Sequence, residues 1–264
     1  MPRIAVTPEP QPYRFFGTFA GLPFWPGGLT LLSAAPGIGK TSWLLRMVME
    51  AAQQGFPAAL GCYEHTAEEL KYRLRLQAEA KAAGAHSKAD ETRVENILAR
   101  AAEAVLLPLS DQEDTIRGIE ETLLQDYNFP VHAPALLAVD YLQRIPVVGV
   151  TGLISEERRG GEAAAVLRAT ARRHGWAVIA ASALRASAFE ERADEIDLSA
   201  LLGDERVTYE PDRVLMMWRR SLKPCGCAEV VVKVLKDRTG PTKTWHMQFW
   251  GERFYPALED EEHD

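Results

Sequence analysis

The stretch from Ala34 to Thr41 has the residue types and the spacing of a phosphate-binding loop. It fits a pattern of Ala or Gly, four further residues, Gly-Lys, and then Thr or Ser. Glycines let backbone N–H groups turn toward phosphate oxygens, and the helix that follows presents its positive end to the anion. In such a loop Lys40 reaches the outer phosphates of ATP, and the Thr41 hydroxyl ligates Mg²⁺. A structural glycine-rich turn is the alternative. The residues expected to hold the nucleotide are Ala35, Pro36, Gly37, Ile38, Gly39, Lys40, Thr41 and Ser42.

Two carboxylates follow apolar runs that predict strands. Asp140 ends the run LLAV and is suited to hold Mg²⁺ together with Thr41. Glu64 follows the run FPAALGCY. Because the carboxyl ends of adjacent parallel strands open onto one crevice, we expect Glu64 beside the terminal phosphate, where it orients the attacking water. The alternatives are that Asp140 caps a helix and that Glu64 pairs with the positive end of the next helix.

The elements that must position these residues are strands and helices in alternation. The predicted strands cover residues 29–34, 56–63, 104–109, 134–142 and 176–182, and the predicted helices cover 41–54, 66–83, 114–127 and 155–175. After residue 211 three further strands follow one another, at 213–218, 228–236 and 243–250. The sequence therefore predicts an α/β fold with a mostly parallel central sheet flanked by helices and a C-terminal antiparallel extension.

Composition narrows the class of protein. The 264 residues are 47% hydrophobic and carry 30 basic and 37 acidic side chains, a formal charge of −7, which excludes a mainly disordered chain and a uniformly basic nucleic-acid binder. Three cysteines are too few for a disulfide scaffold, and no apolar run approaches the ~20 residues of a membrane span. We therefore expect a cytoplasmic protein with no membrane partner.

Several segments together resemble the ATPase domain of DnaB-type replicative helicases, within the RecA-like superfamily. They are GGLTLLSAAPGIGKTS at 27–42, CYEHTAEEL at 62–70, LLAVDYLQRIP at 136–146, VIAASALRAS at 178–187 and VVVKVLKDRTGPTKTWHMQF at 230–249. The resemblance implies a RecA-like P-loop ATPase domain at 15–258. We expect a flexible Pro-rich arm at 1–14 and an acidic tail at 259–264 on either side of it.

The resemblance also implies roles for single residues. Glu64 matches the catalytic glutamate, and Gln143 matches a residue that couples the terminal phosphate to the DNA-facing loops. Lys236 and Arg238 match a basic pair that a neighbouring subunit inserts toward ATP, and a solvated hairpin face is the alternative for this pair. A site shared in this way implies a homo-oligomer, such as a hexamer.

The sequence also departs from the family in two places. Only the Pro-rich arm precedes the ATPase domain, so we expect the family's N-terminal domain to be lacking. The strand at 176–182 ends in Ser182-Ala183 instead of Ser-Gln, and residues 185–206 hold seven acidic and three basic side chains, which disfavours contact with phosphates.

Two functions remain open. The first is a Mg²⁺-dependent ATP hydrolase that acts as an oligomeric motor in DNA replication, recombination or repair. It would be stimulated by single-stranded DNA and would have another replication or repair protein as a partner. The second is an ATP-switched RecA-like assembly or regulatory ATPase that controls a protein partner without unwinding DNA. The D-Y-L-Q and K-x-R-x-G elements favour the first, and the acidic loop favours the second.

Overall fold

A computed structural model describes most of the chain. The described residues are 12–13, 22–83, 90–111, 113–147, 155–189, 195–223, 226–240 and 242–258. Most of the expected arm at 1–14, the whole of the expected tail at 259–264 and part of the acidic loop therefore lie outside them. Tyr13, within the expected arm, forms an isolated antiparallel bridge with Phe24, and its hydroxyl donates to the Gly175 carbonyl at 2.9 Å.

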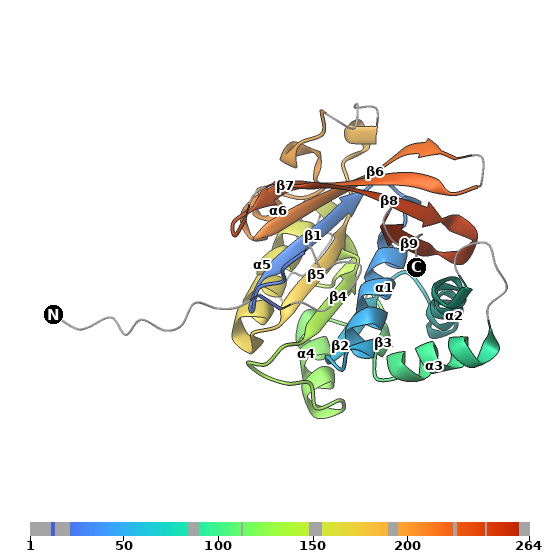
Figure 1. Ribbon diagram of the computed structural model, residues 1–264. Helices are drawn as coiled ribbons and strands as arrows, with labels where there is room; N and C mark the ends of the chain where they lie inside the picture. Colours follow the sequence, from blue (N-terminus) through green and yellow to red (C-terminus); the bar gives the residue numbers. More distant parts are fainter. Residues whose placement is uncertain are drawn as a thin grey trace.

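A single nine-stranded sheet runs through the described part of the chain (Figure 1), in the order β3-β2-β4-β5-β1-β6-β7-β8-β9. Strands β3, β2, β4, β5, β1 and β6 pair in parallel, and β6 to β9 pair antiparallel. This order confirms the predicted parallel sheet with an antiparallel extension. The strands are β1 (Leu29–Ala34), β2 (Ala58–Cys62), β3 (Val105–Pro108), β4 (Leu136–Asp140), β5 (Ala177–Ser182), β6 (Arg213–Leu222), β7 (Ala228–Asp237), β8 (Thr244–Trp250) and β9 (Tyr255–Leu258).

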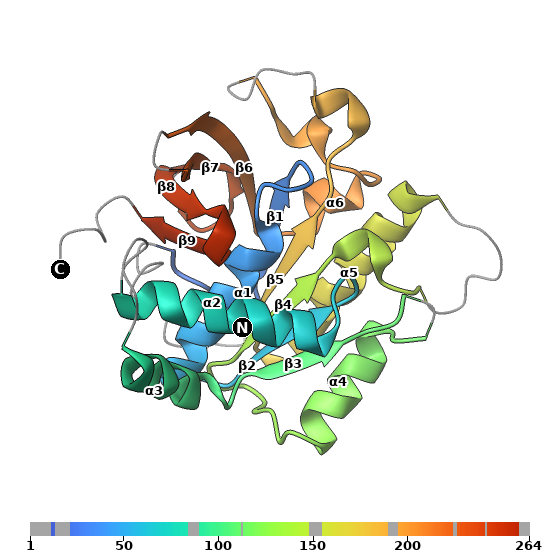
Figure 2. The same cartoon turned by 90° about the vertical axis from the view of Figure 1, so that its right-hand side faces the viewer.

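Helices cover both faces of the parallel strands (Figure 2). The α-helices are α1 (Lys40–Gln53), α2 (Ala67–Ala83), α3 (Glu91–Ala101), α4 (Ile116–Gln125), α5 (Glu156–His174) and the short α6 (Arg206–Tyr209). The 3₁₀ turns are η1 (Leu142–Arg144), η2 (Ala186–Phe189), η3 (Leu198–Ala200) and η4 (Gly251–Arg253). The described residues include no helix that combines the length and the apolar character needed to cross a membrane.

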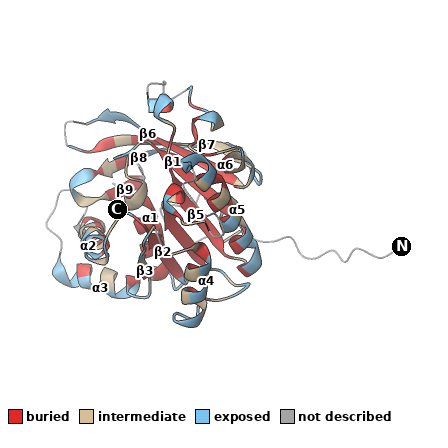
Figure 3. Cartoon of the chain, turned by 180° about the vertical axis from the view of Figure 1, so that it is seen from behind, coloured by how far each residue is buried: buried red, intermediate tan, exposed pale blue. Residues whose placement is uncertain are grey.

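The core consists of two layers, one on each face of the sheet. Alternate residues of β1 point to opposite faces, so Leu32 belongs to the apolar layer that includes residues of α1, and Leu31 belongs to the layer that includes residues of α4 and α5. Figure 3 shows these strands as the most buried part of the molecule, with the outer faces of the helices exposed. Burial on both faces explains why the parallel strands are continuous apolar runs in the sequence.

Local sequence signals explain where several helices begin and end. Thr66 and Glu69 form a reciprocal capping box before α2, with N···O distances of 2.9 and 3.2 Å. Gly175 ends α5 at a φ of 72°, in the left-handed region that glycine tolerates. Helix α3 was not predicted because only Val94 and Ala101 among its residues are buried. Asp90, which accepts from two backbone N–H groups at its start, is the signal that could have found it.

A buried ion pair attaches the last strand to the first helix. The side chains of Arg46 and Glu50 in α1 are 1% and 4% exposed, with an Nε–Oε1 distance of 2.9 Å. Arg46 also donates to the Pro256 carbonyl and lies 4.3 Å from the ring centroid of Tyr255. One guanidinium thus joins α1 to β9. The sequence of β9 itself carries no strong signal for a strand.

We predict that Glu50→Ala lowers the free energy of unfolding by about 3–5 kcal/mol, because it leaves a buried guanidinium without its carboxylate. Urea denaturation measures the change. Glu121→Ala is the matched control: it breaks the exposed Arg117–Glu121 pair of α4, 3.0 Å long, and should cost less than about 1 kcal/mol. Equal losses in the two variants would contradict the assignment of Arg46 as the anchor of β9.

Candidate nucleotide site

The phosphate-binding loop lies where the sequence predicts it, between the end of β1 at Ala34 and the start of α1 at Lys40. Gly37 and Gly39 have φ angles of 76° and 106°, in the left-handed region that a side chain would strain. Gly39 has a second constraint: a Cβ atom there would lie 3.0 Å from the ring of Phe249 in β8. Backbone conformation therefore favours glycine at both positions, and close packing adds a second requirement at Gly39.

Lys40 lies folded back over its own loop. Its Nζ donates to the carbonyls of Ala34 at 2.9 Å and Ala35 at 3.4 Å. Burial lowers the pKa of Lys40, while the nearby carboxylates of Asp140 and Glu64 oppose this shift. A phosphate group entering the site would give this desolvated ammonium a full anionic partner.

A cavity of about 580 Å³ opens beside the loop and contains the first candidate carboxylate. Glu64, two residues beyond the end of β2, lines it together with His65. The lining also includes Phe249 and Phe254, and the Arg73 guanidinium lies 4.6 Å from the centroid of the Phe254 ring. The cavity thus combines a phosphate-binding loop with aromatic and charged side chains, as a nucleotide site requires.

Asp140, the second candidate carboxylate, is fully buried at the end of β4. Burial raises its pKa, and a hydrogen bond with Thr41 and the charge of Lys40 oppose that shift. Its Oδ1 has no hydrogen-bond partner among the described residues. A buried carboxylate oxygen without a hydrogen-bond partner, next to a threonine hydroxyl, is suited to bind a divalent cation, since Mg²⁺ prefers oxygen ligands.

His65 is a site residue that sequence reasoning missed. Ligand atoms of Glu64, His65 and Asp140 lie within 4.8 Å of one another. The imidazole Nδ1 also lies 3.5 Å from Glu69, the capping residue of α2. The only signal in the sequence is that His65 directly follows Glu64. One histidine next to a carboxylate does not form a recognisable ligand motif.

Gln143, in η1, is buried and connects three segments. Its Nε2 donates to Ser182 Oγ at 3.1 Å and to the Leu202 carbonyl at 2.6 Å, and its Oε1 accepts from the Ala183 N–H at 3.1 Å. It therefore holds together the ends of β4 and β5 and the loop after β5. Ala183, at the position where the sequence lacks the expected glutamine, also lines the cavity.

Lys236 and Arg238 do not join this group of residues. Leu31 of β1 pairs with Val214 of β6, which pairs with Lys236 of β7. The N–H of Arg238 bonds to the Asp212 carbonyl, beside the start of β1 at Leu29. Along β1, the row of Arg238 lies five residues from Ala34, about 16 Å at 3.3 Å per residue, and the row of Lys236 lies three residues away, about 10 Å. The basic pair thus lies at the end of the sheet opposite to the phosphate-binding loop.

Comparison with known proteins identifies the family of this chain. A family model for the DnaB-like helicase C-terminal domain matches residues 19–255. The chain belongs to this family. No curated protein sequence gives a significant match.

Two solved structures share the fold of this DnaB-like chain. One, described as an ATPase domain, superposes with a TM-score of 0.72 at 19% identity, covering 88% of this chain and 84% of that one. The other, a DnaB-like replicative helicase described with its interactions with primase, gives a TM-score of 0.76 at 18% identity and covers 96% of this chain. The match spans only 65% of that helicase's chain. These likenesses confirm the RecA-like fold.

We predict that Lys40→Ala weakens ATP binding by about 10- to 100-fold, the cost of one charge-assisted contact. Titration with a fluorescent ATP analogue measures the dissociation constant. The control is Lys71→Ala, which removes an exposed lysine of α2 that does not line the cavity. Unchanged affinity in Lys40→Ala would contradict the phosphate-loop assignment.

Proposed function

We propose that this DnaB-like chain hydrolyses ATP with Mg²⁺ and works as an oligomeric motor on single-stranded DNA in replication, recombination or repair. One observation carries the proposal: the phosphate-binding loop and Glu64 line one cavity, and a ligand atom of the buried Asp140 lies within 4.8 Å of one of Glu64, although the three follow or end three different strands. A structural glycine turn would need neither carboxylate. The family supports a helicase-type ATPase.

Each residue of the proposed site has a distinct task. Backbone N–H groups of the loop and the Lys40 ammonium bind the phosphates of ATP. Thr41 and Asp140 hold Mg²⁺, which when bound neutralises phosphate charge. Glu64, exposed in the lining of the cavity, orients a water molecule toward the terminal phosphate and accepts its proton. Gln143, bonded to the Ala183 N–H, holds the part of the cavity wall that follows β5.

Arg238 and Lys236 act in this proposal on the ATP of a neighbouring copy. A planar guanidinium is suited to stabilise the charge that spreads over the transferred phosphoryl group. The position of the pair, at the far end of the sheet from its own loop, supports action in trans. We therefore propose a homo-oligomer with shared sites, such as a hexameric ring. A primase or another replication protein is the partner class, since a similar helicase has been described with primase.

A second function, an ATP-switched regulator of a protein partner, is favoured by the loop after β5. Arg185 pairs with Glu157 and donates to the Gly203 carbonyl, and Arg206 pairs with Asp204 and Glu162. These cations are therefore already neutralised within the chain. Phosphates of DNA would find little free positive charge among the described residues of this loop.

Hydrolysis measured with and without single-stranded DNA at two salt concentrations separates the two functions. The motor predicts that DNA raises kcat and that added salt weakens this stimulation, because DNA binding releases counterions. Lys40→Ala serves as the control for contaminating ATPases. Hydrolysis that is indifferent to DNA at both salt concentrations would contradict the motor and favour the regulatory function.

Mixed oligomers test whether the site is shared. Glu64→Gln and Arg238→Ala subunits should each be nearly inactive alone. Mixing them should restore part of the turnover, because an Arg238→Ala subunit keeps its own Glu64 and receives an intact Arg238 from its neighbour. Mixing Glu64→Gln with Lys40→Ala is the control and should restore nothing, since both changes disable the same half of the site. No recovery at any ratio of the first pair would refute action in trans.

A further inference from the structure

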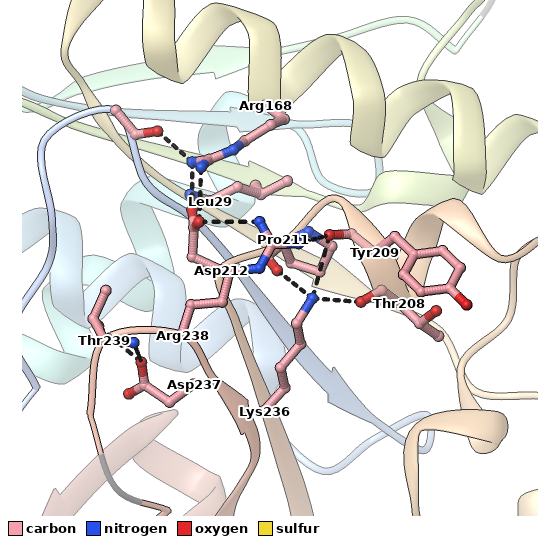
Figure 4. Close-up of polar contacts among 11 residues, drawn as sticks. Leu29, Arg168, Thr208, Tyr209, Pro211, Asp212, Lys236, Asp237, Arg238 and Thr239 are labelled. Carbon is pink, nitrogen blue, oxygen red and sulfur yellow. Dashed lines mark hydrogen bonds and ion pairs between the residues drawn. The ribbon is translucent and has the colours of Figure 1, made fainter.

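The carboxylate of Asp212 is the centre of a polar cluster around the basic pair (Figure 4). Its Oδ2 accepts from the Leu29 N–H at 2.9 Å, and both of its oxygens accept from Arg168 of α5, one of them at 2.7 Å. Arg168 also donates to the Gly27 carbonyl. The side chains of Arg168 and Asp212 are only 11% and 16% exposed. This fork-to-fork pair fixes the carboxylate rigidly at the start of β1.

Arg238 shares the same carboxylate, but more loosely. Its Nη1 lies 3.6 Å from Asp212 Oδ1, and its Nη2 donates to the Tyr209 carbonyl. The Arg238 side chain is 44% exposed, four times the exposure of Arg168. The guanidinium is therefore held in a defined place while one side remains open to solvent.

Lys236 completes the cluster on the other side of Arg238. Its Nζ donates to the carbonyls of Thr208 at 2.6 Å, Tyr209 at 3.3 Å and Pro211 at 2.7 Å. Burial lowers the pKa of Lys236, and so does the charge of Arg238, whereas Asp212 opposes both. Three cations, Arg168, Lys236 and Arg238, thus surround the Asp212 carboxylate at the end of the sheet opposite to the phosphate-binding loop.

We propose that Asp212, fixed by Arg168, is a positioning residue that aims the Arg238 guanidinium at the ATP of a neighbouring subunit. The inference rests on the proposed action of Arg238 in trans. Without the carboxylate, Arg168 and Lys236 would repel Arg238, and its guanidinium would lose the ion pair that supplements its bond to the Tyr209 carbonyl. The 3.6 Å contact is weak enough to be exchanged for a phosphate and close enough to limit where the side chain can point.

The charge balance of the cluster separates this role from simple support of the fold. Arg168 alone satisfies both oxygens of Asp212, so the ion pair between α5 and the start of β6 would be complete without Arg238. A purely structural pair would affect stability in the same way whether or not Arg238 is present. A positioning residue would affect kcat only through Arg238.

A double-mutant cycle in the oligomeric protein tests this distinction. We expect Arg238→Ala to lower kcat by about 10³-fold. We expect Asp212→Asn, which keeps the shape of the side chain and removes its charge, to lower kcat by about 10- to 100-fold with little change in the KM for ATP. In the Arg238→Ala background Asp212→Asn should have no further effect on kcat, because its target is absent. Asp212→Glu, which restores the charge, should recover part of the lost rate.

Controls remove the ambiguity of a folding defect. Glu120→Gln removes the charge of a buried carboxylate that pairs with Arg173 at 2.8 Å. Arg173 lies on the same helix as Arg168, α5, but the Glu120 pair does not contact the cluster at Asp212. It should lower the melting temperature and leave kcat unchanged. If Asp212→Asn does not fold, Arg168→Lys replaces it in the cycle, since lysine keeps the charge but loses the bidentate geometry.

Each outcome decides one question. A full rate in Asp212→Asn together with a lost rate in Arg238→Ala would overturn the positioning role alone. An equal loss from Asp212→Asn in both backgrounds would also overturn it and would assign a structural role. A full rate in Arg238→Ala would overturn the action in trans, and the role of Asp212 with it. Loss in both single variants without further loss in the double variant supports the proposal.

Discussion

The parallel pairing of β2, β4, β5 and β1 is the constraint on which the rest of this molecule depends. Parallel strands present all their carboxyl ends at one edge, and burial on both faces fixes their register because a slip of one residue would expose apolar side chains. This edge carries the phosphate-binding loop, Asp140 and Glu64. Strand β7 runs antiparallel to β6, so Arg238, which follows its carboxyl end, lies at the opposite end of the sheet. The sheet thus determines which residues share a site and which are kept apart.

Desolvation gives the proposed site its chemical character. Asp140 is buried and Lys40 is half-buried. Burial raises the pKa of Asp140 and lowers that of Lys40, and both shifts favour the uncharged form. Lys40 contacts loop carbonyls, and Asp140 keeps one oxygen without a partner among the described residues. Such groups gain more from an anion and a cation than solvated groups would, because little water has to be displaced and the local dielectric is low.

How far the sequence predicts this structure depends on the distance between interacting residues along the chain. The phosphate-binding loop and the capping box of Thr66 and Glu69 are local, so their spacing alone identifies them. The parallel strands follow from their apolar runs. The cluster at Asp212 could not be predicted, because Arg168 lies 44 residues away and contacts it only after α5 packs on the sheet. Strand β9 escaped prediction for the same reason, since Arg46 of α1 anchors it.

The antiparallel extension connects the two edges of the sheet, and this connection bears on how a shared site could work. Phe249 of β8 packs against Gly39 of the phosphate-binding loop, while β7, the next strand, leads through Lys236 to Arg238. Strands β7 and β8 are joined by a continuous ladder from Ala228 to Lys233. Any movement of this extension relative to β1 would therefore change the packing of the subunit's own loop and the aim of its basic pair together. A close-packed interior transmits such a shift instead of absorbing it, so the proposed ATP site and the proposed contribution to the neighbour's site are mechanically parts of one body.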